Sequence, residues 1–186
     1  MAFVLDLVPH MDAGDRDQWS GDQDHRPLTD LGWRQAHAFA DAMSGEHIDA
    51  LYAGPALRCR QTLEPLAERL GLAVGVCPEL GEKQAWRLPD GWGPGPGDAA
   101  HAAGMALRGI DKLRTLHPNE AVVACSHGHV IPALVAYLVA IHGLHDVAQL
   151  TFAIARHAAR RGQWYRLRFE AERVAIELRE AQGFPN

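Results

Sequence analysis

The sequence predicts an α/β protein with three layers, α/β/α, a mainly parallel central sheet and an antiparallel edge hairpin near the C-terminus. Its 186 residues match the size of one domain, so residues 1–186 are expected to form a single unit. Short apolar runs alternate with amphipathic stretches of helical period, which is typical of parallel strands covered by helices on both faces. Two further strand-like stretches follow each other closely near the end of the chain.

The first elements follow this alternation. Residues 3–8 form a nearly continuous apolar run that suits a buried strand, although Asp6 interrupts it. Thr29 can cap the next segment, a helix that runs to about Met43. Its apolar face would carry Ala36, Phe39, Ala40 and Met43. A second strand is expected over residues 48–53.

The middle of the chain continues with a helix over residues 57–70, which Gly71 would end. Residues 72–76 are expected to form a short strand. The segment 89–97 is rich in proline and glycine and is therefore expected to be a loop. It lacks the Gly-Lys-Ser/Thr ending of a phosphate-binding P-loop. The inward face of the helix would carry Cys59, Leu63, Leu66, Ala67 and Leu70.

The last third returns to alternation. Helical period resumes over residues 99–117, a buried strand is expected over 121–125, and the helix predicted over 130–141 is apolar on almost all sides. Residues 164–169 and 174–178 flank a short turn and predict an antiparallel hairpin at the sheet edge.

Composition excludes several classes of protein. The net charge of −5, from 18 Lys and Arg against 23 Asp and Glu, argues against a nucleic-acid-binding protein, which needs a basic surface. No apolar run approaches the roughly 18 residues of a membrane helix, and the N-terminus does not resemble a signal peptide. The three cysteines are an odd number without metal-site spacing, which fits a reduced, cytoplasmic setting. No pattern predicts a particular oligomeric state.

Chemically active residues follow the ends of three predicted strands. His10 follows the first strand, Arg58 and Arg60 begin the helix after the second, and His127 and His129 follow the strand at 121–125. Ligands of such sheets bind beyond the carboxyl ends of the strands, where a helix N-terminus adds positive partial charge. The pattern predicts a phosphoryl group held by cations beside a neutral imidazole placed for attack.

Four motifs occur in order over about residues 3–141. They read Val8-Pro9-His10-Met11-Asp12-Ala13-Gly14; Arg26-Pro27-Leu28-Thr29-Asp30-Leu31-Gly32 with Gln35-Ala36; Tyr52-Ala53-Gly54-Pro55-Ala56-Leu57-Arg58-Cys59-Arg60-Gln61-Thr62; and Val122-Val123-Ala124-Cys125-Ser126-His127-Gly128.

Together these motifs resemble those of the histidine phosphatase superfamily, and the length is similar to its small, phosphohistidine-phosphatase-like branch. The resemblance implies hydrolysis of a phosphomonoester or a phosphohistidine, with no metal or other cofactor. His10 would be the nucleophile that takes the phosphoryl group, and Arg58 and His127 would hold its oxygens. The substrate would be a small phosphorylated molecule or a phosphoprotein.

The acid that protonates the leaving group in this superfamily usually lies between the second and the last motif. Glu82 is the closest match at that place, and Glu79 is the nearby alternative. Some small members of the superfamily lack this acid.

One residue departs from the family pattern. The superfamily places arginine immediately before the nucleophile, whereas this chain has Pro9, which offers neither a guanidinium nor an N–H. Losing one such contact costs about 2.7–4 kcal/mol, or roughly 10²–10³ in rate, by analogy with oxyanion donors. Arg26 and Arg16 are the nearest cations that could compensate, and Arg26 is the preferred phosphate-binding candidate.

Two alternatives remain open. The loss of an arginine at Pro9 is also compatible with a regulatory module that binds a phosphorylated ligand with little or no turnover. A metal-dependent hydrolase could use His127 and His129, but no cluster of Cys or carboxylate residues accompanies them. Arg60 is expected at the rim or in solvent, and Cys59 and Cys125 are expected to be buried thiols of the core.

Overall fold

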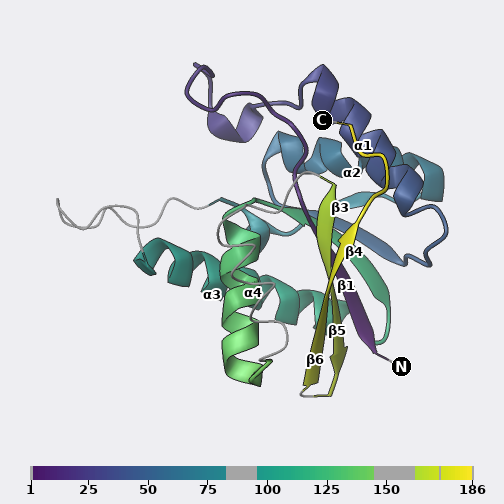
Figure 1. The fold of residues 1–186 in the computed structure, drawn as a ribbon, viewed down its shortest axis with the longest axis vertical. Helices are drawn as coiled ribbons and strands as arrows, with labels where there is room; N and C mark the ends of the chain where they lie inside the picture. The colour runs from purple at the N-terminus through teal and green to yellow at the C-terminus, as the bar shows by residue number, and fades with distance from the viewer. Residues whose placement is uncertain (1, 83–95, 145–161, 172, 186) are drawn as a thin grey trace.

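The computed structural model describes residues 2–82, 96–144, 162–171 and 173–185, and it has one six-stranded sheet at its centre (Figure 1). The strand order is β3-β2-β4-β1-β5-β6. Strands β1 to β4 pair in parallel, whereas β5 pairs antiparallel with both β1 and β6. The expected α/β class, the parallel centre and the C-terminal hairpin are therefore confirmed. The strands are β1 (Phe3–Pro9), β2 (Ala50–Ala53), β3 (Val74–Val76), β4 (Ala121–Ser126), β5 (Gln163–Glu170) and β6 (Arg173–Glu180).

Local sequence signals account for the ends of the helices. The Thr29 side chain accepts a hydrogen bond from the Gly32 N–H and caps α1, as predicted. Gly71 ends α2 with a φ of 65°, a left-handed conformation that glycine adopts at little cost. The helices are α1 (Asp30–Ala42), α2 (Leu57–Leu70), α3 (Pro96–Leu116) and α4 (Val130–His142), with 3-10 turns η1 (Gln23–His25) and η2 (Pro78–Leu80).

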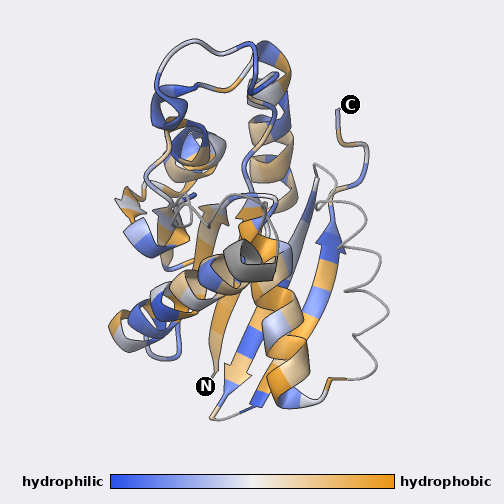
Figure 2. Ribbon diagram, turned by 90° about the vertical axis from the view of Figure 1, so that its left-hand side faces the viewer, coloured by the Kyte–Doolittle hydropathy of each residue, from blue (hydrophilic) through white to orange (hydrophobic). Residues whose placement is uncertain are grey.

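Helices cover both faces of the sheet (Figure 1). Helices α3 and α4 pack on one face in a cluster that includes Leu5 and Leu7 of β1. Helices α1 and α2 pack on the other face in a cluster that includes Val8. Figure 2 shows the matching hydropathy, with apolar residues along the strands and alternating polar and apolar residues in β5 and β6. The three predicted layers are therefore present.

Several boundaries differ from the sequence-based expectation. Strands β2 and β3 begin two residues later than predicted. Helix α3 begins at Pro96 rather than at residue 99. Proline is tolerated there because the backbone N–H at the first position of a helix has no hydrogen-bond partner within the helix. The remainder of the expected loop, residues 89–95, lies outside the described residues. Helix α4 lies where it was expected, and two of its apolar side chains, Tyr137 and Ile141, are exposed.

No helix within the described ranges has both the length and the apolar character needed to cross a membrane.

A buried ion-pair network explains the charged residue in the first strand. Asp6 is 3% exposed and accepts hydrogen bonds from Trp164 Nε1 at 3.0 Å and from Arg166 Nε and Nη2 at 2.9 and 2.8 Å. Arg166 Nη1 also donates to Glu46, which in turn accepts from Arg179. The network ties β1 to β5 and β6 and to the segment after α1.

We predict that Asp6→Ala lowers the free energy of unfolding by about 3 kcal/mol or more, because it leaves Arg166 and Trp164 buried without their main acceptor. Urea denaturation of the purified variant measures this loss. The double variant Asp6→Leu with Arg166→Met should lose less, since no unpaired charge remains in the sheet. A loss below about 1 kcal/mol for Asp6→Ala would contradict a stabilising role for the network.

Candidate active site

Parallel pairing of β1 with β4 brings two distant histidines together. Pro9 lies opposite Ser126 in the register, and the His10 N–H donates to the Ser126 carbonyl at 2.9 Å. His10 and His127 therefore leave the sheet at the same edge. Their ring centroids lie 5.4 Å apart with an interplanar angle of 73°.

The His10 ring is held in one tautomer. Its Nδ1 lies 2.8 Å from the Met11 carbonyl oxygen, which can only accept, so Nδ1 carries the proton and Nε2 carries the lone pair. Burial lowers the pKa of His10 from 6.5 to about 4, although Cys59 and the bond to Met11 act in the opposite direction. At neutral pH the ring is therefore uncharged and nucleophilic at Nε2.

Arg58, in the first turn of α2, is a buried cation that contacts His127. Its side chain is 1% exposed, and Nη1 donates to the Gln23 carbonyl. Nη2 donates to Glu82 Oε2 at 2.8 Å and lies 3.4 Å from His127 Nδ1. The other ring nitrogen of His127, Nε2, lies 3.7 Å from the Cys59 thiol. Arg58 and His127 form what we call the inner pair.

Glu82 connects this inner pair to a second pair of basic side chains. Its Oε1 lies 2.8 Å from Arg16 Nη1 and 3.8 Å from His129 Nε2, which we call the outer pair. Its Oε2 faces the inner pair, at 2.8 Å from Arg58 and 3.7 Å from His127. Burial acts to raise the pKa of Glu82, but the four basic groups outweigh it and lower that pKa. Glu82 is therefore ionised at neutral pH.

The motif residues of α1 and α2 hold the backbone that follows His10. The Met11 N–H donates to Thr62 Oγ1 at 3.0 Å, and the Asp12 N–H donates to Gln35 Oε1 at 2.9 Å. At Gly32 a Cβ atom would clash with the Asp12 carbonyl oxygen, so the close approach of α1 to this loop requires glycine. These residues fix the direction in which His10 leaves the strand.

A second set of contacts places the segment that carries Glu82. Ser126 Oγ donates to the Leu80 carbonyl at 2.8 Å. A Cβ atom on Gly54 would lie 2.8 Å from that same oxygen, so β2 and β4 both approach the segment closely. The ends of two strands thus anchor the turn just before Glu82.

Glu79, the alternative acid, has other partners. Its Oε2 lies 3.3 Å from the Cys77 thiol and 3.6 Å from Lys112 Nζ of α3. None of the contacts found for Glu79 in the described chain involves His10 or the inner pair, whereas Glu82 lies beside both members of that pair.

Arg26 supports the loop after His10. It is 7% exposed, and its Nη1 donates to the carbonyl oxygens of Ala13 and Gly14 at 2.9 and 2.7 Å. Burial, followed by the neighbouring Arg58, lowers the pKa of Arg26. Its buried Nε has no hydrogen-bond partner within the described residues. Arg26 is therefore close to the inner pair while its Nη1 is committed to the loop backbone.

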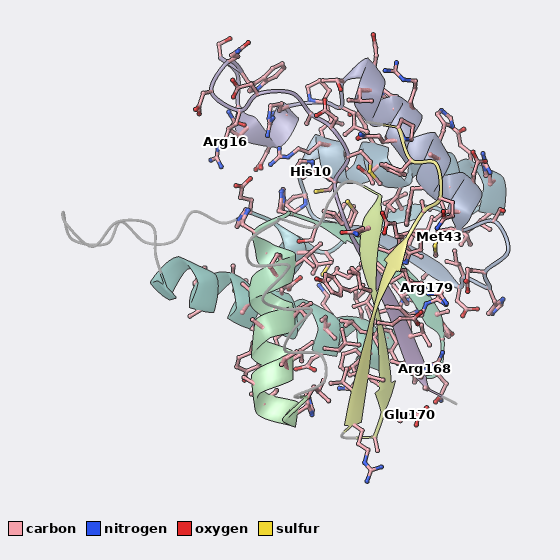
Figure 3. The ribbon with its side chains drawn as sticks, in the orientation of Figure 1. His10, Arg16, Met43, Arg168, Glu170 and Arg179 are labelled. Carbon is pink, nitrogen blue, oxygen red and sulfur yellow. The ribbon has the colours of Figure 1, made fainter. Side chains whose placement is uncertain are left out.

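The structure brings His10, Arg58, His127 and Glu82 to one edge of the sheet and ties Arg26 to the adjoining loop. Figure 3 shows His10 and Arg16 at this same end of the molecule. Arg60 is exposed and Cys59 and Cys125 are buried free thiols, as predicted. The described residues contain no group of three or more His, Cys, Asp or Glu side chains arranged to hold a metal ion.

Sequence reasoning missed three contacts of this site. The Gln23 carbonyl on Arg58, the Cys59 thiol beside His127 and the Ser126 hydroxyl on Leu80 all depend on tertiary packing. Cys59 and Ser126 adjoin Arg58 and His127 in the sequence. This adjacency was the one sequence feature that could have indicated that they take part in the site.

Comparison with known proteins agrees with the motif pattern. The family model for the histidine phosphatase superfamily, branch 1, matches residues 12–92. The 8-oxo-(d)GTP phosphatase of Mycolicibacterium smegmatis is 30% identical over 131 residues, which cover 70% of this chain and 36% of that protein. The chain therefore spans about a third of that relative. The uncharacterized protein Rv0525 of Mycobacterium tuberculosis is 30% identical over 149 residues, covering 69% of this chain and 74% of Rv0525.

Solved structures share the fold over almost the whole chain. A mycobacterial glucosyl-3-phosphoglycerate phosphatase superposes with a TM-score of 0.69 and 20% identity, covering 97% of this chain and 98% of that one. The family match, the identity to the mycobacterial relatives and the shared fold agree with one another. The chain belongs to the histidine phosphatase superfamily.

Proposed function

We propose that this protein is a metal-independent phosphatase that hydrolyses a phosphomonoester or a phosphohistidine through a phospho-His10 intermediate. The observation that carries the proposal is the neutral His10 ring, whose Nδ1 is tied to the Met11 carbonyl while Nε2 keeps its lone pair beside the inner pair. A fixed, uncharged imidazole next to a buried guanidinium is suited to attack on a phosphoryl group.

In the first step, His10 Nε2 attacks phosphorus and the bond from phosphorus to the leaving oxygen breaks. Arg58 and His127 bind the phosphoryl oxygens, one of which replaces Glu82 Oε2 on the Arg58 guanidinium. The phosphoryl charge then offsets the cations that lower the pKa of Glu82. Glu82 takes up a proton from solvent and gives it to the leaving oxygen.

In the second step, water attacks the phosphorus of phospho-His10 and the P–N bond breaks. Glu82, now a carboxylate, accepts the proton of the attacking water. Inorganic phosphate and neutral His10 are the products. Glu82 then releases its proton to solvent, so the enzyme returns to its starting state without any cofactor.

The names of the relatives support phosphoryl hydrolysis as the reaction class. One relative is described as an 8-oxo-(d)GTP phosphatase and one structural neighbour as a glucosyl-3-phosphoglycerate phosphatase. We infer that the substrate of this chain is likewise phosphorylated, either a small molecule or a phosphoprotein.

Pro9 favours a second candidate function, a phospho-ligand-binding module with weak or no turnover. Pro9 is buried at the end of β1 and supplies no cation to the phosphoryl group.

Arg26 is the proposed substitute for the missing arginine, because it lies near Arg58 and has an unpaired buried Nε, although its Nη1 holds the loop. In that case we expect Arg26→Lys to lower the activity, since the ammonium group of lysine cannot replace the planar, bidentate guanidinium of arginine.

We expect His10→Ala to abolish phosphatase activity while the protein stays folded, because alanine has no nucleophile to offer. Hydrolysis of p-nitrophenyl phosphate with EDTA present measures the activity, and circular dichroism checks the fold. Wild-type turnover that EDTA removes would favour a metal-dependent hydrolase instead. Substantial turnover by His10→Ala would eliminate His10 as the nucleophile.

The pH dependence follows from the same residue. Because the pKa of His10 is lowered to about 4, the ring is neutral above that pH and protonated below it. We expect kcat/KM to rise with pH through about 4 and to show no further His10-linked increase near 6.5. An NMR titration of the His10 ring checks the assignment, and a midpoint near 6.5 would contradict it.

We predict that Arg58→Ala weakens vanadate inhibition at least tenfold, because a charge-assisted hydrogen bond is worth about 1.5–3 kcal/mol. Arg60→Ala is the matched control, since Arg60 lies two residues further along the same helix and is exposed. Inhibition constants of both variants give the comparison. Equal effects would mean that the inner pair does not hold the anion.

We expect Pro9→Arg to raise kcat/KM for p-nitrophenyl phosphate above that of the wild type, since it restores a guanidinium beside His10. Thermal unfolding confirms that the variant is folded. An unchanged or lower rate in the folded variant would mean that the site is organised around proline.

A further inference from the structure

The charges around Glu82 are unbalanced. Within the described residues, this single carboxylate faces two guanidinium groups and two imidazoles, with the inner pair on Oε2 and the outer pair on Oε1. Arginine stays charged at any working pH, so Arg16 and Arg58 alone exceed the charge of Glu82. A ligand with more than one negative charge would satisfy this arrangement better than Glu82 does.

The two pairs also differ in depth. The side chains of Arg58 and His127 are 1% and 2% exposed, whereas those of Arg16 and His129 are 51% and 55% exposed. The inner pair lies beside His10, where the transferred phosphoryl group must be. Figure 3 shows Arg16 further out than His10 at the same end of the molecule, so we expect the rest of the substrate to extend toward the outer pair.

The hydrogen bonds of the loop around Arg16 do not involve its guanidinium, which pairs with Glu82. The Asp15 carboxylate accepts from the Asp17 N–H at 3.0 Å and from Gln18 Nε2 at 3.2 Å. The Arg16 carbonyl accepts from Gln23 Nε2 at 3.2 Å, which ties the loop to the backbone that holds Arg58. Arg16 is thus positioned by the loop, and the ion pair found for its guanidinium is the one to Glu82.

We propose that the outer pair, Arg16 and His129, binds a second anionic group of the substrate, a carboxylate or a phosphate that lies within a few bonds of the scissile P–O bond. The proposal rests on the phosphatase function above and names its substrate class. The phosphoryl group takes the place of Oε2 on the inner pair, and the second anion takes the place of Oε1 on the outer pair. Burial lowers the pKa of His129, so Arg16 carries the charge of this subsite and His129 contributes a hydrogen bond.

Two small substrates of the same length separate this subsite from the phosphoryl site. Phosphoglycolate and O-phosphoethanolamine are both two-carbon phosphomonoesters, but the first ends in a carboxylate and the second in an ammonium group. Inorganic pyrophosphate supplies a phosphate as the second anion. The wild type should prefer phosphoglycolate or pyrophosphate to O-phosphoethanolamine by at least about tenfold in kcat/KM.

The Arg16→Gln variant tests the residue. Its loss in kcat/KM should be about tenfold larger on the preferred substrate with a second anionic group than on p-nitrophenyl phosphate and O-phosphoethanolamine, and the extra loss should lie mainly in KM. His129→Gln should have a smaller effect of the same kind. Arg60→Gln is the control for removal of an exposed arginine.

Each outcome discriminates. An equal loss on all substrates would show that Arg16 serves the transferred phosphoryl group or the acid Glu82, and would overturn the proposal. The proposal would also be overturned if the wild type did not prefer the substrates with a second anionic group, phosphoglycolate and pyrophosphate. If p-nitrophenyl phosphate is not hydrolysed at all, the phosphatase function fails by itself. Calorimetric titration of wild type and Arg16→Gln with phosphoglycolate and O-phosphoethanolamine then tests the subsite by affinity alone, with the same tenfold expectation.

Discussion

The parallel pairing of β1 with β4 is the constraint on which the site depends. The ladder runs to the last residue of both strands, and the His10 N–H continues it by donating to Ser126. Two histidines more than a hundred positions apart in the chain therefore leave the sheet side by side. A register shift of one residue would turn every side chain of β1 to the other face and move His10 away from His127. The buried apolar clusters on both faces of the sheet prevent such a shift.

Around this edge of the sheet, several polar side chains form hydrogen bonds to backbone groups and fix their position. Thr62, Gln35 and Arg26 bind the loop after His10, and Ser126 binds the turn before Glu82. An active-site residue on a loop gains its precision from such supports, because the loop itself has little packing to define it. Motif positions that look catalytic by their place in the sequence are thus in part structural.

The burial of Arg58 gives the site its electrostatic character. A fully buried guanidinium is costly unless it is paired, and here a carbonyl oxygen, a carboxylate and an imidazole surround it. The same cluster lowers the pKa of Glu82, while burial lowers that of His10. A neutral imidazole and an anion held among cations therefore follow from one desolvated arrangement.

The sequence by itself determined the α/β class, the cap at Thr29, the stop at Gly71 and the strand ends that carry His10, Arg58 and His127, because periodicity, capping and strand-end chemistry are local signals. It also marked Asp6 as an anomaly without explaining it. Only the tertiary structure decided that Asp6 pairs with Arg166, that Glu82 rather than Glu79 faces the histidines, and that Arg26 clamps a loop while Arg16 reaches Glu82. These outcomes depend on which side chains meet after distant segments pack, and no local pattern records those distances.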